Sequence, residues 1–274
     1  MLRRGFVWGD IKWGKVRLAP FIVGIYEAQL WNMDHELAHL MEDWMDEGGA
    51  EFMRPQPAIH RVVPAQSSVK TDWILPHDDI KAILKTKKSF RVRDCICRVQ
   101  QEHLGERTCD FPSHVCLNFT SFERPPSDND ISMEEALNLI DETEAVGLVH
   151  SVSNIAEGFF YVCNCCGCCC GILRGITEFG IENSVAASNY YAVIDPELCR
   201  GCGACIERCQ VEAISELDEK SVVNKEKCIG CGLCVSGCKN EVAKLVRKPE
   251  DEIINPPKDF AVWEHERLVN RGLK

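Results

Sequence analysis

The sequence has no long apolar run, and its basic residues are outnumbered by acidic ones. The longest partly apolar stretch, Leu18 to Leu30, is interrupted by Pro20, Gly24 and Glu27, and it is shorter than the about 20 residues that a membrane-spanning helix needs. The 31 Lys and Arg residues against 42 Asp and Glu residues give a net charge of −11. This balance argues against nucleic acid as the main partner, because a phosphate backbone requires clustered basic side chains. We therefore expect no membrane span and no nucleic acid as main partner.

Targeting and nucleotide-binding signals are also weak or missing. Arg3-Arg4 faintly resembles a twin-arginine export signal, but the charged segment Trp8–Lys12 follows it, where an apolar core would be needed. We find no glycine-rich loop of the kind that binds flavin or nucleotide phosphates. We therefore expect a cytoplasmic protein, with any catalytic centre on a partner.

Cysteine, by contrast, is abundant: the 274 residues include 18 cysteines. Disulfides would explain an even number in a secreted protein, but the spacing here requires reduced thiolates. Eight cysteines form two copies of the pattern C-x2-C-x2-C-x3-C, which begin at Cys199 and Cys228. In this pattern three cysteines hold one [4Fe–4S] cluster and the fourth holds the neighbouring cluster. The spacing predicts one cluster on Cys199, Cys202, Cys205 and Cys238, and a second cluster on Cys228, Cys231, Cys234 and Cys209.

The residues around these motifs repeat as well, since Ala192–Asp195 and Ser221–Asn224 precede the two copies at equivalent positions. Residues 189–247 resemble the two-cluster bacterial ferredoxin domain. That family usually has proline after the fourth cysteine, whereas this chain has Gln210 and Lys239, each of which adds an N–H group near a cluster. Paired zinc knuckles are the alternative, but they use C-x2-C pairs with a longer spacer.

A second group of cysteines lies upstream, in the pattern C-x-C-x11-C-x6-C. We expect the strand Phe90–Asp94 to continue into Cys95 and Cys97, which would then share one face. Four thiolates suit a cubane or a zinc ion equally, and core cysteines without a metal are a third interpretation. The candidate ligands are Cys95, Cys97, Cys109 and Cys116.

A third group places six cysteines within eight residues. Adjacent side chains of an extended chain point to opposite sides, so we expect Gly167 and Gly171 to turn the chain. The group predicts thiolates for one or two further clusters, shared with the second group, or else cysteines that only pack. Two extra cubanes would use eight of the ten upstream cysteines. The candidate ligands are Cys163, Cys165, Cys166, Cys168, Cys169 and Cys170.

Together these motifs resemble a family of largely uncharacterised 4Fe–4S binding proteins from anaerobic microbes, over most of residues 20–247. The resemblance implies a redox role without a defined substrate. It also implies that a predicted hairpin at residues 5–18 is the remnant of a winged-helix-like domain. The motifs that carry the likeness are Asp94–Arg98, Cys109–Pro112, Cys116-Leu117, Gly147–His150, Cys163–Cys166 and the terminal two-cluster domain.

A long helix is predicted from Tyr26 to Glu47 on the spacing of its apolar residues. Within it, His35-Glu36-Leu-Ala-His39 matches the zinc-protease pattern H-E-x-x-H. No third ligand follows, so a solvated helical face is the simpler interpretation. The expected apolar stripe consists of Leu30, Met33, Leu37, Leu40, Met41 and Trp44.

The sequence as a whole predicts an α+β protein with three parts. A cysteine-rich region of helices and small sheets would span residues 1–188, and a ferredoxin-like domain with two [4Fe–4S] clusters would span 189–247. Residues 248–274 would be a linker and a docking tail, with Phe260, Trp263 and Leu268 on one side of a short helix. A capping box at Ser132 predicts a further helix that ends at Gly147.

The expected function is electron transfer through two or more [4Fe–4S] clusters, as a subunit or partner of a larger anaerobic redox complex. One or two of these clusters would lie in the upstream region, with zinc as the minor alternative there. A reductase with an open iron at Cys163–Cys170 is a second hypothesis, and a redox or metal sensor is a third. A redox partner protein is implied in each electron-transfer case, and the oligomeric state is left open.

Overall fold

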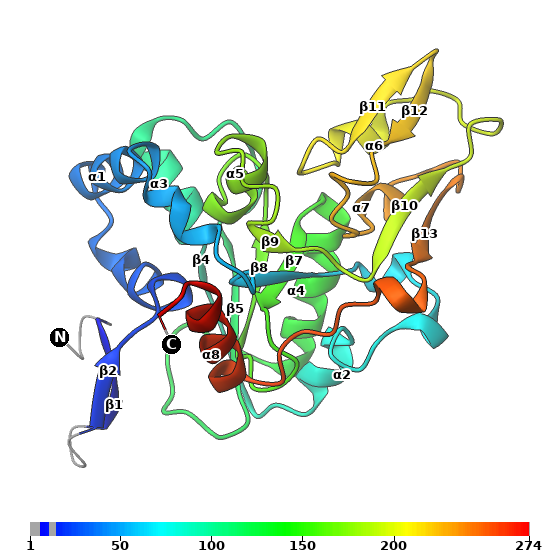
Figure 1. Cartoon of the computed structure of the whole chain (residues 1–274). Coiled ribbons are helices and arrows are strands. Elements are labelled where there is room, and N and C mark those ends of the chain that lie inside the picture. Colours follow the sequence, from blue (N-terminus) through cyan, green and yellow to red (C-terminus); the bar gives the residue numbers. More distant parts are fainter. Residues whose placement is uncertain (1–5, 11–14, 274) are drawn as a thin grey trace.

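The computed structural model describes residues 6–10 and 15–273, and a seven-stranded sheet forms its centre (Figure 1). The strand order is β6-β4-β5-β8-β7-β3-β9. Neighbours are antiparallel except β3 and β9, which are parallel. The strands are β3 (His60–Val63), β4 (Ser89–Asp94), β5 (His114–Thr120), β6 (Asp130–Ile131), β7 (Val149–Ser153), β8 (Tyr161–Cys165) and β9 (Val185–Ala186).

The expectation of small sheets in this region was wrong, although the mixed α+β class is confirmed. Short strands that lie far apart in the sequence join in one sheet, and only their partners in space reveal this. In residues 58–75 the only strand is β3, and two 3₁₀-helical turns cover Gln66–Ser68 and Thr71–Trp73.

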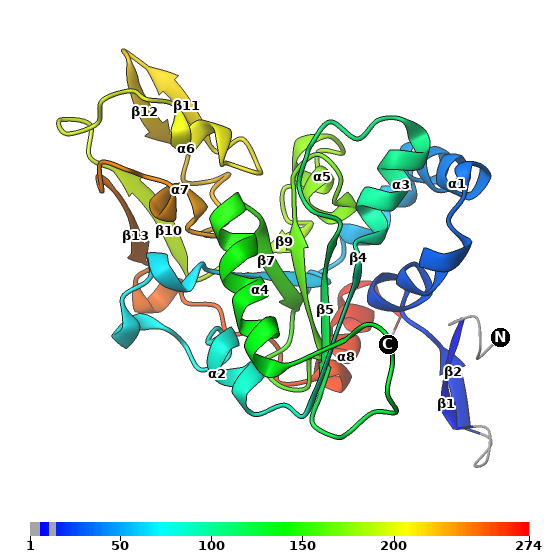
Figure 2. The ribbon, with the colours of Figure 1, turned by 180° about the vertical axis from the view of Figure 1, so that it is seen from behind.

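Two helices cover one face of the sheet, as Figure 2 shows. They are α2 (Ile80–Lys85) and α4 (Met133–Val146). Ser132 caps α4 in the predicted capping box, and Gly147 ends the helix with a left-handed φ of 98°. Their apolar sides bury the core of this face, where Leu84 and Ile140 pack on Leu117.

The predicted helix from Tyr26 to Glu47 is divided in two. A 3₁₀-helix covers Glu27–Asn32, Met33 is extended, and α1 begins at His35 and ends at Asp46. The break arises because Asp34 is the N-cap of α1, with its carboxylate accepting the Leu37 N–H at 2.9 Å. The Tyr26–Glu47 prediction missed this cap because the apolar spacing continues across it.

The predicted apolar stripe is only partly buried: Leu30, Met33, Leu37 and Met41 pack in one apolar cluster. Leu40 and Trp44 are exposed, whereas the buried residues are Ala38, Glu42 and Met45. Glu42 is buried because it pairs with Arg174 of α5 (Gly171–Thr177). Beside α1 lies α3 (Ile96–Leu104).

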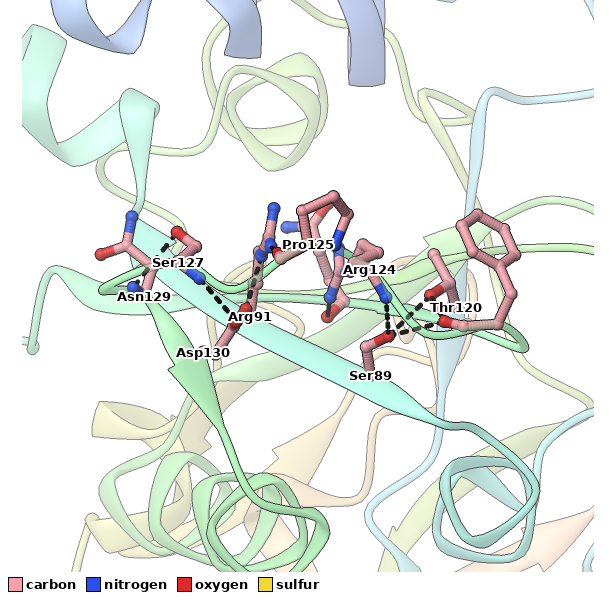
Figure 3. Close-up of polar contacts among 10 residues, drawn as sticks. Ser89, Arg91, Thr120, Arg124, Pro125, Ser127, Asn129 and Asp130 are labelled. Carbon is pink, nitrogen blue, oxygen red and sulfur yellow. Dashed lines mark hydrogen bonds and ion pairs between the residues drawn. The ribbon is translucent and has the colours of Figure 1, made fainter.

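One edge of the sheet is closed by the loop between β5 and β6 (Figure 3). Arg91 of β4 donates to Asp130 of β6 at 2.5 Å and to the Pro125 carbonyl. Ser89 of β4 accepts the Arg124 N–H at 3.1 Å. The loop is thereby held against β4, and it covers an edge that would otherwise be open to other strands.

The ferredoxin-like region lies beside the sheet, on the side away from the N-terminal hairpin (Figure 1). β10 (Tyr190–Ile194) pairs with β13 (Ala243–Arg247), and β11 (Ile214–Leu217) pairs with β12 (Lys220–Val223). In sequence, the short helix α6 (Ala204–Glu207) follows β10, and the short helix α7 (Leu233–Ser236) follows β12. The first strand of the region therefore pairs with its last strand, and the two middle strands pair with each other.

Segments near the two termini lie close together, since Arg17 and Glu264 are 3.6 Å apart. β1 (Val7–Asp10) and β2 (Lys15–Leu18) pair within the hairpin predicted for residues 5–18, and the strand expected at Ile11–Trp13 lies outside the described residues. α8 (Phe260–Asn270) returns to the body, where Trp263 donates to the Ala58 carbonyl at 2.9 Å. A winged-helix origin for the hairpin stays a prediction. The remaining short helical segments of the described chain are Phe21–Ile25, Gly49–Met53 and Glu250–Glu252.

Within the part of the chain that the structure describes, no helix has the length and apolar character to cross a membrane.

Candidate metal centres

The first set of ferredoxin-type cysteines surrounds one small cavity, and the set includes the fourth cysteine of the other motif. The lining contains Cys199, Cys202, Cys205 and Cys238. The Gly201 N–H donates to the Cys199 sulfur at 3.5 Å. N–H groups of Ser221 and Gly201 lower the pKa of Cys199, because they stabilise the thiolate. The structure therefore brings these four side chains together, and their role as the ligands of one cluster stays a prediction.

The second set lies deeper in the protein. Burial, together with the nearby Cys209 and Cys228, raises the pKa of Cys231 to about 12. Cys209, Cys228 and Cys231 are in turn neighbours of Cys234. The Ala213 N–H donates to the Cys209 sulfur at 3.1 Å. Cys209, the last cysteine of the first motif, thus lies with the second motif.

The two halves repeat in backbone detail, with the same offset of 29 residues as Cys199 and Cys228. A Cβ on Gly201 would lie 2.1 Å from the Glu219 carbonyl oxygen, and one on Gly230 would lie 2.3 Å from the Tyr190 carbonyl oxygen. Both glycines also have positive φ angles, 65° and 68°. Glycine is required at both positions because the cysteine loops run against the backbone.

Residues 191–239 match the 4Fe-4S dicluster domain family. The matched segment contains all eight cysteines of the two motifs. A search of curated proteins finds no match to the chain. The chain therefore carries a ferredoxin-type 4Fe-4S domain, which indicates an iron–sulfur electron-transfer protein. We call residues 190–247 the ferredoxin domain, the Cys199–Cys205 segment its outer loop and the Cys228–Cys234 segment its inner loop.

The inner loop is held against the N-terminal region by its backbone carbonyls. The Cys231 carbonyl accepts the Ala65 N–H at 2.9 Å. Ser68 donates to the Gly232 carbonyl at 2.8 Å, and Ser188 donates to the Gly230 carbonyl at 2.7 Å. The outer loop has no such contact with residues 15–188, and its Cys202 is exposed.

Gln210, which stands where the ferredoxin family usually has proline, joins the ferredoxin domain to the third cysteine group. Its side chain accepts the Gly167 N–H at 2.7 Å and donates to the Gly147 carbonyl at 3.0 Å. The contact is close, because a Cβ on Gly167 would lie 2.2 Å from the Gln210 carbonyl oxygen. The Gln210 side chain therefore holds the ferredoxin domain against the N-terminal region, and its backbone also has the N–H group that proline lacks.

The third cysteine group is divided between two sites by local geometry. Cys163 and Cys165 lie on β8, where alternate residues share one face. Asn164, between them, points the other way, to His150 at 2.7 Å and to the Val115 carbonyl at 2.7 Å. The chain then turns through Cys166–Cys169 and enters α5.

One of these sites has the dimensions of a single ion. Sulfur–sulfur distances are 4.0 Å for Cys109–Cys166, 3.7 Å for Cys109–Cys169 and 3.6 Å for Cys168–Cys169. All four sulfurs lie within 4.8 Å of one another, and among the described residues no other group of potential ligands is as compact. A tetrahedral ion with bonds of about 2.3 Å places its thiolates about 3.8 Å apart. We call Cys109, Cys166, Cys168 and Cys169 the four-thiolate group.

The six other upstream cysteines line a neighbouring cavity. They are Cys95, Cys97, Cys116, Cys163, Cys165 and Cys170. The expectation that Cys95 and Cys97 extend a strand was wrong, because β4 ends at Asp94 and Cys95 is the N-cap of α3. The second cysteine group therefore does not form one site: Cys109 belongs to the four-thiolate group, and its three other members face the cavity.

The histidines of the zinc-protease pattern lie on the exposed side of α1. The Nε2 atoms of His35 and His39 are 3.3 Å apart on the exposed first turns of α1, and Glu36 is exposed beside them. The compact ligand group found in the described residues contains neither histidine.

Two residues near the metal sites were missed by sequence reasoning. Arg98, next to Cys97, is fully buried among cysteines. The inner loop has Ile229 at the position where the outer loop has Arg200. Ile229 is buried, whereas Arg200 is exposed. The apolar residue inside the second C-x2-C was a visible sign that this loop is covered.

Proposed function

We propose that this protein transfers electrons between a redox partner and its own N-terminal cysteine-rich region. Cys199, Cys202, Cys205 and Cys238 would hold the outer [4Fe–4S] cluster, and Cys228, Cys231, Cys234 and Cys209 the inner one. Such clusters, when bound, supply one-electron transfer at a potential set by burial and by N–H groups near sulfur.

One observation supports this direction most strongly: the inner loop and the upstream cysteines share one packed core. Ile229 and Leu233 of the inner loop pack with Cys165 and Cys170 of the N-terminal region. Cys209, Cys228 and Cys231 border the same core. A carrier that only shuttled electrons would need no such contact, so the inner site is suited to exchange electrons with metal held upstream.

The outer loop is suited to meet the partner. Cys202 is exposed, and Leu198, next to Cys199, is 62% exposed. Exposed apolar side chains beside a ligand favour a protein contact. We propose that the chain works within a larger redox complex in a reducing cytoplasm, where thiolates persist.

The four-thiolate group would hold one tetrahedral ion, for which zinc and iron are both suitable. Its distances support zinc more than the sequence did, and a zinc ion there would be redox-silent. The reductase hypothesis would instead require an iron that lacks a thiolate in the region Cys163–Cys170. Changes in the electron paramagnetic resonance spectrum on adding small ligands would reveal such an iron.

Metal analysis of anaerobically purified protein tests the proposal. We expect more than about eight irons per chain, the content of two [4Fe–4S] clusters. Rapid-freeze spectroscopy after mixing with dithionite should show upstream metal that is reduced along with the ferredoxin clusters. A content of eight irons, with upstream metal that does not change on reduction, would leave a ferredoxin attached to a structural metal domain.

A further inference from the structure

The cavity beside the four-thiolate group has sulfur on several sides. Its lining includes the six cysteines outside that group, contributed by α3 and its N-cap, β5, β8 and the N-cap of α5. Cys166 and Cys169 of the four-thiolate group touch the same cavity, so the two sites share a wall. The six side chains thus converge from four separate parts of the fold.

These six cysteines line one cavity and each has others of the set as neighbours, so we call them the six-cysteine ring. Cys97 interacts with Cys95 and Cys170, and Cys165 interacts with Cys170 and Cys163. Cys116 is a neighbour of Cys163 and of Cys95. The ring is wider than the four-thiolate group, since its sulfurs do not all lie within 4.8 Å of one another. Its size suits several metal ions rather than one.

Arg98 provides independent evidence of negative charge at this place. Its exposed fraction is 0%, and its Nε atom has no hydrogen-bond partner. The other guanidinium nitrogens donate to the backbone carbonyls of Pro112 at 3.1 Å and of Asn164 at 3.0 Å, and the side chain also contacts the Cys166 thiol, on the wall that the two sites share. The thiol groups of Cys95, Cys166 and Cys165 are its neighbours.

Two other buried arginines show what Arg98 is missing. Arg61 pairs with Asp78, and Arg174 pairs with Glu42 and Glu178. No carboxylate pairs with Arg98 anywhere in the described chain. Burying a cation without a counter-charge costs several kcal/mol. That cost is removed if the surrounding cysteines are thiolates in an anionic metal centre.

The number of thiolates indicates the kind of centre. Each iron of a cubane has three sulfides and one outer ligand, so one cubane uses four thiolates. Two cubanes joined by one bridging sulfide have six irons left for thiolates. Thiolates outnumber the positive charge of such a core, so the centre is anionic. We propose that the six-cysteine ring holds one iron–sulfur centre larger than a single cubane, with Arg98 as its buried counter-charge.

Paired substitutions in the third cysteine group test this directly. Cys165 and Cys166 are adjacent in sequence but belong to different sites, as do Cys169 and Cys170. We expect the full-length variant Cys165→Ser/Cys170→Ser to lose more than four irons per chain. The matched variant Cys166→Ser/Cys169→Ser should lose the equivalent of one metal ion. Loss of four irons or fewer from the first variant would overturn the proposal.

Substitution of Arg98 tests the counter-charge without removing a ligand. We expect Arg98→Met to shift the midpoint potential of the upstream centre to a more negative value, because the more anionic reduced form loses its cation. Arg98→Lys, which keeps the charge, should stay near the wild-type potential. Equal potentials in the three proteins would assign Arg98 a packing role only and overturn the proposed pairing.

The metal analysis does not depend on the proposed electron-transfer function. Loss of iron in the ring variant with unchanged transfer through the ferredoxin domain would support the centre and count against the proposed path. Unchanged iron content in the ring variant with impaired electron transfer would count against the centre and support the proposed path.

Discussion

The outer and inner cysteine loops have the same spacing but opposite surroundings. Arg200 and Cys202 of the outer loop are exposed. At the equivalent positions of the inner loop, Ile229 is buried and the Cys231 carbonyl is bonded to Ala65. The features that the two loops share therefore place the cysteines, whereas the residues that differ between them decide which loop packs against the N-terminal region. A nearly symmetric domain thus has one covered loop and one exposed loop.

The same contrast extends to the residues that follow each motif. Arg208 donates to the Ala145 and Glu144 carbonyls at the C-terminal end of α4, both at 2.9 Å. A cation is favourable there because this end of a helix carries partial negative charge. Its counterpart 29 residues later is Gly237, and a Cβ there would lie 2.3 Å from Arg208 Cδ. One half thus supplies the contact, and the other half makes room for it.

The largest effect is expected from breaking the interleaved ligands. Cys209→Ala should damage the inner cluster and spare the outer one, although Cys209 follows the outer motif in sequence. Cys238→Ala should do the opposite. Iron analysis and electron paramagnetic resonance of the reduced proteins would show which cluster is affected.

Matched behaviour of the two variants would sharpen the comparison of the loops. Electron delivery to the upstream region should stop in Cys209→Ala, because the inner site borders that region. If Cys209→Ala instead removes the cluster of the outer loop, each motif holds its own cluster and the assignment is wrong.

A smaller effect is expected from the residues inside the first C-x2-C of each loop. Ile229→Ala should lower the free energy of unfolding by about 2–4 kcal/mol, because it leaves a cavity in the core that joins the two regions. Arg200→Ala should change it by less than about 0.5 kcal/mol, because its side chain is exposed. Urea unfolding of the anaerobic proteins measures both, and equal losses would show that the outer loop is covered as well.

Much of the metal chemistry could be predicted from the sequence, because ligand spacing is local. The two motifs, their repeat and the fourth-cysteine exchange depend on short loops whose glycines are visible in the sequence. The partition of the ten upstream cysteines is not local. It depends on β5 and β8 being neighbours in the sheet and on α3 lying beside them, which no periodicity indicates.

Element boundaries explain the remaining errors. The strand that was expected to continue to Cys97 ends at Asp94, and Cys95 is instead the N-cap of a helix. The helix after Tyr26 is broken because Asp34 caps a new helix, although apolar residues keep helical spacing across the break. At Asp34 a single polar residue thus decides the local structure against the apolar pattern.

The smallest effect, and the most specific, is expected at Gln210. Gln210→Ala removes two hydrogen bonds to the N-terminal region, to Gly167 and to Gly147, and should cost about 1–2 kcal/mol of stability. The equivalent substitution in the other half, Lys239→Ala, should have no measurable effect, because Lys239 is exposed.

The two variants separate docking from cluster binding, because neither residue is a ligand. We expect both proteins to keep their full iron content, whereas electron transfer from the ferredoxin domain to the upstream region should slow in Gln210→Ala alone. Rapid-freeze spectroscopy would measure this rate. Gln210→Pro, which restores the residue usual in ferredoxins, should behave like Gln210→Ala, since proline offers neither the side-chain acceptor nor the donor.

An unchanged rate in both Gln210 variants would mean that the packed core around Ile229 and Leu233 is sufficient for contact between the two regions. Position 210 would then matter only for the N–H group that glutamine adds near the inner cluster, and in that case the proline variant alone would shift the potential of that cluster.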